Sequence, residues 1–218
     1  MSREIVLVSS CTSSKLQIPK RTSTTAEALY TGQQHVRLMR GVRAYRAAGE
    51  PAGELRFRIL SALHGLMIPD RSIRPYDHSF TGLPASTIRR EAQEKNIPAD
   101  IGSLLRRPFE LAVLLLADPY LRACDLTPQT GLGGPVIAFC SPAAAVRIPR
   151  IPGLRTITLS NTEARRFSCG LISLKGELGR RILSRLSEHP REIEDLAGSQ
   201  FDVLHWLEYA RQLELTAA

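Results

Sequence analysis

Hydroxyl, thiol and amine side chains crowd one short segment near the start of the chain, SSCTSSK at residues 9–15. The segment follows an apolar run that is typical of a buried strand. Small hydroxyl side chains and free backbone N–H groups suit a phosphate or a sugar edge, whereas the glycines of a nucleotide-cofactor motif are missing. We therefore predict substrate or nucleic-acid binding by Cys11, Ser13, Ser14 and Lys15. The alternative is a solvated loop with a buried structural thiol, and no partner histidine marks Cys11 as a nucleophile.

A second polar segment follows another apolar run and carries His64, Tyr76 and Asp77. His64 is expected at the carboxyl end of a strand, where open α/β sheets place their ligands. We interpret the segment as a polar pocket in which Asp77 is an ionised acid, Tyr76 offers an aromatic face and His64 exchanges a hydrogen bond. A metal site is the lesser alternative because the ligand spacing is irregular. Tyr76 and Asp77 could also simply anchor a long loop.

Four further residues later in the chain are candidates for binding or catalysis. Ser141 directly follows an apolar run, and Asn161 stands where a strand gives way to a helix, so it is either a cap or a reader of a base edge. Lys175 and Arg180 lie in a helical segment whose amino end and cations could meet a phosphate. For Arg180 a solvated helix face is the simpler interpretation.

The elements that must position these residues alternate along the chain. Five short apolar runs predict strands at residues 4–9, 57–62, 111–117, 135–140 and 155–160. A helix is expected between the first two, where Leu38, Val42 and Tyr45 share one face, and others at 84–95, 119–124, 175–187 and 201–213. Two irregular stretches, 66–83 and 127–135, are expected as loops at the carboxyl ends of strands. The fold class is a single α/β domain over residues 1–218, with a mostly parallel sheet of four to five strands flanked by helices.

Composition sets the broad class. The 218 residues are 43% hydrophobic and 23% charged, which is typical of a globular domain. No apolar run is long enough to cross a membrane, and the four scattered cysteines form no CxxC pair, so we expect a cytoplasmic protein with reduced thiols and no zinc site. The net charge of +8 favours a polyanionic partner, although an arginine-rich composition also fits a GC-rich genome.

Several of these motifs together resemble a family of bacterial and phage domains labelled YaaA-like. The resemblance rests on VSSCTSSK at 8–15, Leu29-Tyr30, ILSALHGLMIPDRSIRPYD at 59–77 and SLKGELGRRIL at 173–183. Leu63 stands where the family usually has a lysine. The resemblance implies a fold distantly similar to uracil-DNA glycosylases and the archaeosine-synthase core, in a protein that acts on or recognises nucleic-acid bases.

A glycosylase relationship implies that a base is flipped into a pocket and its N-glycosidic bond is cleaved, without metal or organic cofactor. Asp77 would stabilise positive charge on the sugar or activate water, and His64 or Asn161 would hydrogen-bond the edge of the base or the leaving group. Tyr30 or Tyr76 would stack on the base, and residues of the first segment would hold phosphate. The expected partner is DNA rather than RNA, with no membrane and no obligate protein partner, and the expected substrate is a modified base, such as a hypermodified phage base met in anti-phage defence.

Three alternatives stay open at this point. They are a DNA-binding stress-response protein that alters nothing, a base-exchange or modifying enzyme on structured RNA, and a hydrolase or transferase of free nucleosides.

Overall fold

The computed structural model describes residues 3–198 and 200–208. Its centre is a six-stranded sheet in the order β4-β3-β1-β6-β7-β8, in which every neighbouring pair except β3 and β4 is parallel. The strands are β1 (Glu4–Ser10), β3 (Glu54–Ser61), β4 (Gly65–Met67), β6 (Leu111–Leu115), β7 (Val136–Cys140) and β8 (Leu154–Thr158). Every residue of β6 and β7 is buried, as expected for strands covered on both faces.

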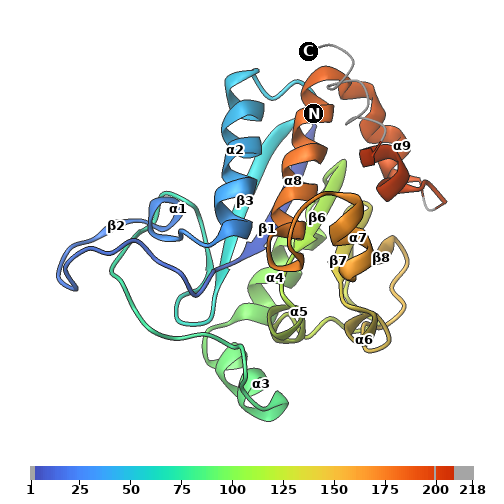
Figure 1. Ribbon diagram of the computed structural model, residues 1–218. Coiled ribbons are helices and arrows are strands. Elements are labelled where there is room, and N and C mark those ends of the chain that lie inside the picture. The colour runs from blue at the N-terminus through green and yellow to red at the C-terminus, as the bar shows by residue number, and fades with distance from the viewer. Residues whose placement is uncertain (1–2, 199, 209–218) are drawn as a thin grey trace.

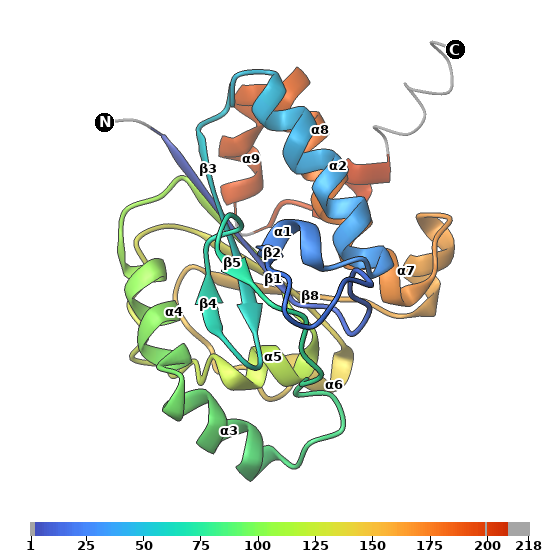
Figure 2. The same cartoon turned by 90° about the vertical axis from the view of Figure 1, so that its left-hand side faces the viewer.

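Helices cover both faces of this sheet. The long helices α2 (Gln33–Ala47) and α8 (Leu171–Glu188) lie side by side on one face, and α4 (Ile97–Arg106) lies on the other (Figures 1 and 2). Near the carboxyl ends of the parallel strands lie α3 (Ala85–Glu94), α5 (Asp118–Ala123), α6 (Pro142–Ala145) and α7 (Asn161–Arg166). The remaining elements are β2 (Thr24–Thr25), α1 (Ala26–Leu29), β5 (Ser72–Ile73), η1 (Pro190–Glu192) and α9 (Ile193–Ala197). The chain is thus a single α/β domain with a mostly parallel sheet.

The predicted strands are confirmed, and so are the helices observed as α2, α3, α5 and α8. Residues 203–208 are helical, and the rest of the helix expected at 201–213 lies outside the described residues. The antiparallel edge strand β4 was not predicted. Neither was α4, because asparagine and proline, here Asn96 and Pro98, are residue types that commonly mark the end of a helix. Asn96 in fact adopts a left-handed backbone (φ 55°) between two helices, and Pro98 lies in the first turn of α4, where proline is tolerated.

The two irregular stretches lie at opposite edges of the sheet. Residues 66–83 begin within β4, include β5, and reach the carboxyl end of β3 at Tyr76, whose hydroxyl bonds Ser61, so the stretch lies at the predicted edge but is not a loop throughout. The prediction for 127–135 was wrong, because this stretch enters β7 at its amino end. Its glycines pack against the backbone that precedes β6: a Cβ at Gly133 would lie 1.9 Å from the Arg107 carbonyl oxygen. This stretch is therefore part of the structural support at the amino edge and not of the ligand edge.

Helices α2 and α8 pack backbone to backbone. A Cβ at Gly41 would lie 2.6 Å from the Cα of Arg180, and one at Gly176 would lie 2.0 Å from the Gln34 carbonyl oxygen. One turn beyond Gln34 on α2, this interface also holds an ion cluster, in which Glu177 accepts hydrogen bonds from three arginines: Arg37, Arg180 and Arg181. Among the described residues, no helix is both long and apolar enough to span a membrane.

Candidate active site at the carboxyl edge of the sheet

The order of the parallel strands reverses between β1 and β6. Numbered along the chain, the five parallel strands have the spatial order 2-1-3-4-5, so the first and third are neighbours. In open sheets of this kind, ligands bind beyond the carboxyl ends of the strands at this reversal. The segment 9–15 leaves β1 there, and residues 116–120 leave β6. The Ser10 hydroxyl joins the two strand ends by accepting a hydrogen bond from the Ala117 N–H at 3.3 Å.

Three hydroxyl side chains, which we call the hydroxyl cluster, meet at this edge: Tyr30, Ser61 and Tyr76. The Tyr76 hydroxyl lies 2.7 Å from the Tyr30 hydroxyl and 2.7 Å from Ser61 Oγ. Ser61 ends β3, and its Oγ also accepts hydrogen bonds from the N–H groups of the following turn. Burial, and then the negative charge that a Cys11 thiolate would carry, raise the pKa of both tyrosines far above the ordinary value. Both are therefore neutral phenols at physiological pH, and Tyr30 is too buried for a base to stack on it.

Cys11 is also buried at this edge, next to a third phenol. Its Sγ lies 3.1 Å from the hydroxyl of Tyr120 on α5, which in turn lies 3.4 Å from Ser79 Oγ. Burial is also the main reason why the pKa of Tyr120 is raised. A neutral phenol is not a base that could activate a thiol. The geometry thus gives Cys11 a hydrogen-bonding role between β1 and α5.

An open pocket of about 510 Å³, which we call the Lys15 pocket, joins the two predicted segments. Its lining includes Ser13, Ser14, Lys15, Tyr76 and Asp77. Lys15 Nζ lies 4.5 Å from the centre of the Tyr76 ring and donates a hydrogen bond to the Ser13 carbonyl oxygen at 3.3 Å. The Asp77 side chain is exposed at the wall of this pocket. Residues more than 60 positions apart therefore present hydroxyls, an ammonium group, an aromatic ring and a carboxylate to one space.

His64 lies on another side of Tyr76. The two rings meet edge to face with their centres 5.0 Å apart, and His64 lines a separate shallow pocket with Arg71 and Arg74. Burial, and then the charges of Arg71 and Lys95, lower the pKa of His64. Within the described part of the chain its buried Nε2 has no hydrogen-bond partner. His64 is therefore a neutral imidazole that supports Tyr76 and does not face Asp77 across the Lys15 pocket.

A second polar group lies at the carboxyl ends of β6 and β7. The Asp118 carboxylate accepts hydrogen bonds from the N–H and the hydroxyl of Ser141, and Lys175 Nζ donates to the Leu116 carbonyl oxygen. Burial lowers the pKa of Lys175, while the charges of Asp118 and Cys140 act in the opposite direction. Ser141 and Lys175 thus lie near the end of β6, but as supports of the backbone and of Asp118. No three His, Cys, Asp or Glu side chains in the described ranges are close enough together to hold a metal ion.

Comparison with known protein families finds a match for the part of the chain that carries these residues. Residues 5–126 match a family of unknown function, DUF6884. The chain belongs to this family. No curated protein matches the chain. The DUF6884 segment runs from β1 to just beyond α5, so it contains the whole hydroxyl cluster, the Lys15 pocket, His64 and Cys11. Ser141, Asn161, Lys175 and Arg180 lie outside it.

Two predicted residues lie apart from the hydroxyl cluster. Arg180 bonds Glu177 at the α2–α8 interface, five residues beyond Lys175. Asn161 is exposed at the start of α7, and the cap of that helix is Ser160, whose hydroxyl accepts from the Thr162 N–H. Helix α7 follows β8, which is three strands from β1 and so roughly 14 Å away across the sheet.

Sequence reasoning missed three residues that shape the candidate site at the carboxyl edge: Ser61, Asp118 and Tyr120. Ser61 and Asp118 carried a usable signal, because each is a polar residue at or just beyond the carboxyl end of an apolar run. Tyr120 carried none, since its contact with Cys11 depends on how α5 packs.

The lysines give an independent indication of where the site lies. The chain has 25 arginines but only four lysines, and two of these, Lys15 and Lys20, line the Lys15 pocket. A third, Lys175, lies at the end of β6. Lysine presents a compact, flexible point charge that arginine does not reproduce. Lys15 and Lys20 therefore support a ligand site at the Lys15 pocket, whereas Lys175 holds the backbone at the end of β6.

Proposed function

We propose that this chain is a DNA glycosylase-like enzyme that flips a modified base out of DNA and cleaves its N-glycosidic bond. The observation that carries the proposal is the exposed carboxylate of Asp77 in the Lys15 pocket, which is also lined by hydroxyl and ammonium groups suited to a phosphate. The pocket volume of about 510 Å³ lies in the range of small-molecule sites, which is adequate for one nucleotide. The proposal includes the distant relationship to uracil-DNA glycosylases that the motif resemblance implies.

Phosphate binding comes first in the proposed mechanism. Ser13, Ser14 and Lys15 would hold the phosphate beside the flipped nucleotide. Lys15 now lies over the Tyr76 ring, so its movement to a phosphate would uncover that ring for stacking with the base. Tyr30 and Ser61 hold the Tyr76 hydroxyl, so the ring is already oriented before the base arrives.

Bond cleavage then depends on charge. As the bond between sugar and base breaks, positive charge develops on the sugar, and the negative Asp77 carboxylate would stabilise it. The same carboxylate would accept a proton from the water that attacks the anomeric carbon, while the base leaves with the electron pair of the broken bond and takes up a proton from solvent. The products are the free base and an abasic site in the DNA. Tyr30 and Ser61 take part only by positioning Tyr76.

The test is incubation of the protein with normal and hypermodified phage genomic DNAs. Mass spectrometry of the filtrate should detect a released base, and the DNA should acquire alkali-labile sites in equal number. Binding of every DNA without release would favour a non-enzymatic DNA-binding protein. Release or exchange from structured RNA alone, or from free nucleosides alone, would favour the other two classes of enzyme.

A further inference from the structure

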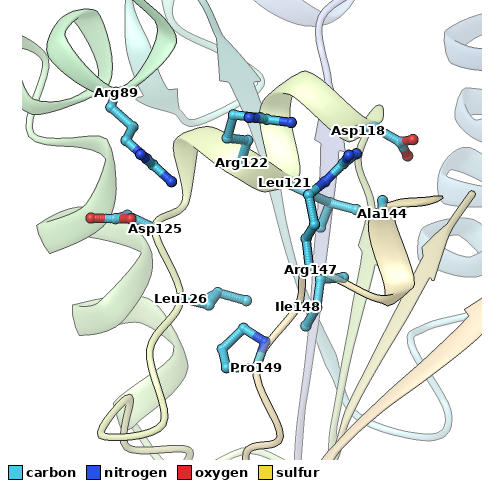
Figure 3. A pocket seen from close by; sticks show the side chains of 10 residues that line it. All are labelled: Arg89, Asp118, Leu121, Arg122, Asp125, Leu126, Ala144, Arg147, Ile148 and Pro149. Atoms are coloured by element: carbon cyan, nitrogen blue, oxygen red, sulfur yellow. The ribbon is translucent and has the colours of Figure 1, made fainter. Parts of the chain in front are cut away.

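A second pocket at the carboxyl edge carries three arginines from three different parts of the chain. It is lined by Arg89 on α3, Arg122 on α5 and Arg147 just after α6, and we call it the arginine pocket. Figure 3 shows Arg89 pointing from α3 toward the hollow and Arg147 extending toward α5. An apolar floor lies between them, made of Leu121, Leu126, Ala144, Ile148 and Pro149.

The arginines of this pocket differ from many others in the chain. Ten arginines form ion pairs with carboxylates, among them the two on α8 that hold Glu177. Within residues 3–198 and 200–208, no ion pair or side-chain hydrogen bond is seen for Arg89, Arg122 or Arg147. Three guanidinium groups around one hollow repel one another unless an anion lies between them.

Two carboxylates also line the pocket, but they leave the positive charge in excess. Asp118 is already engaged by the N–H and hydroxyl of Ser141. Asp125 is exposed at the rim, facing Arg89 in Figure 3. Three cations against two anions, one of them already hydrogen-bonded, still favour an added negative group.

The size of the pocket limits what that group can be. A volume of about 140 Å³ is smaller than the roughly 300 Å³ at which sites for whole small molecules begin. A phosphate with part of the attached sugar fits, since guanidinium groups bind phosphate oxygens in pairs and a sugar can rest on an apolar floor.

Helix α5 (Asp118–Ala123) lies between the arginine pocket and Cys11 at the end of β1. Tyr120 faces Cys11 and Ser79 on one side of α5, while Leu121 and Arg122 line the arginine pocket on the other. Cys11 and Ser79 each lie two residues along the chain from a residue that lines the Lys15 pocket, Ser13 and Asp77, so both pockets lie at the carboxyl edge of the sheet.

We infer that the arginine pocket binds a phosphate group, and that in the enzyme proposed above this is a backbone phosphate of the DNA next to the flipped nucleotide. The inference rests on the proposed function only for the source of the phosphate.

The test compares Arg122→Gln and Arg147→Gln with Arg191→Gln. Arg191 is exposed in η1, between α8 and α9, so its variant removes the same charge without touching the arginine pocket. Affinity for a fluorescent 20-base-pair duplex is measured against salt concentration. Each pocket variant should bind about tenfold more weakly, as expected for loss of one charge-assisted contact, and its salt slope should fall by about 0.9. Arg191→Gln should change affinity less than twofold.

Equal losses in all three variants would overturn the inference, because they would indicate a general charge effect. Wild-type binding of DNA without base release would remove the glycosylase proposal, yet the arginine pocket would stand if its variants still bound more weakly than Arg191→Gln. If the wild type binds no DNA, calorimetry with inorganic phosphate tests whether the arginine pocket binds an anion. Phosphate binding that is lost in the two pocket variants would support the anion site, and no phosphate binding would overturn it.

Discussion

At the residue scale, Tyr76 connects the parts of the candidate site. Its hydroxyl bonds Tyr30 and Ser61, one ring face meets the ammonium group of Lys15, and His64 packs against it edge to face. Tyr76 directly precedes Asp77, so the bonds that hold the Tyr76 side chain also hold the backbone from which the Asp77 side chain projects. Positioning of this kind, rather than any chemistry of the phenol itself, is what the neutral Tyr76 can supply.

Removing the Tyr76 hydroxyl should destabilise the fold. Tyr76→Phe leaves the buried Tyr30 hydroxyl without that partner, so unfolding in urea should show a loss of about 1–3 kcal/mol. Tyr30→Phe should also destabilise. The double variant should lose less than the sum of the two, because it leaves no orphaned phenol from that bond. Simple additivity of the two losses would show that the Tyr30–Tyr76 bond contributes nothing.

The candidate site was predictable from the sequence only where a motif carries it. Lys15 and Asp77 lie in segments with an unusual density of polar residues directly after apolar runs. Their meeting in one pocket required the parallel pairing of β1 with β3, which places both segments at one edge. Tyr120 and Asp118 belong to a short helix without such a motif, and their partners are fixed only by tertiary packing.

At the scale of elements, the close approach of α2 and α8 sets the position of the carboxyl edge. Gly176 on α8 allows contact with the backbone of Gln34, and Gln34 in turn donates a hydrogen bond to the Leu115 carbonyl oxygen at the end of β6. The Gln34 side chain therefore links the helix pair to β6, the strand that borders the site.

Gly176→Ala should force these helices apart. The new Cβ would clash with the backbone of Gln34, which cannot rotate away as a side chain can. We therefore expect the free energy of unfolding to fall by about 1–3 kcal/mol. Gly102→Ala on α4 is the matched control, because a Cβ there meets nothing within 4 Å. The control should be neutral or up to about 1 kcal/mol more stable. Equal effects of the two substitutions would refute close packing at Gly176.

The ion cluster on α8 should make stability depend on pH. Burial raises the pKa of Glu177, but hydrogen bonds from Arg180 and Arg181 and their charge outweigh it and lower the pKa to about 2. The stabilisation is therefore complete above the unfolded-state value of about 4.5 and is lost as pH falls toward 2. Glu177→Gln should cost about 2 kcal/mol at pH 7 and roughly half of that at pH 3. A cost that is the same at both pH values would contradict this account.

The sheet could be predicted because buried strands appear as continuous apolar runs. Edge strand β4 is three residues long and lies in a Pro- and Asp-containing segment, so it has no comparable pattern. Helix α4 was not predictable because Pro98 ends a helix at most positions but is tolerated in the first turn, where it lies in α4.

At the scale of the whole molecule, a net charge of +8 and two basic pockets at one edge favour a polyanion. Because bound phosphates release counterions, affinity for DNA should fall linearly with salt on a logarithmic scale, with a slope of roughly −0.9 for each phosphate contact. Fluorescence anisotropy at salt concentrations from roughly 50 to 200 mM measures this slope, because DNA affinity changes strongly over that range. Salt-independent affinity would point to free nucleosides as substrates.

The most direct test of the central claim is single-turnover base release by Asp77→Asn on the phage DNA that the wild type cleaves. The substitution keeps the shape of the side chain and removes its charge. Asp70→Asn, which alters a nearby exposed aspartate outside the Lys15 pocket, is the control. The account predicts unchanged DNA binding and melting temperature, with release slowed about a hundredfold or more, equivalent to about 3 kcal/mol. Near-normal release by folded Asp77→Asn would contradict it and leave Asp77 as an anchor of the loop.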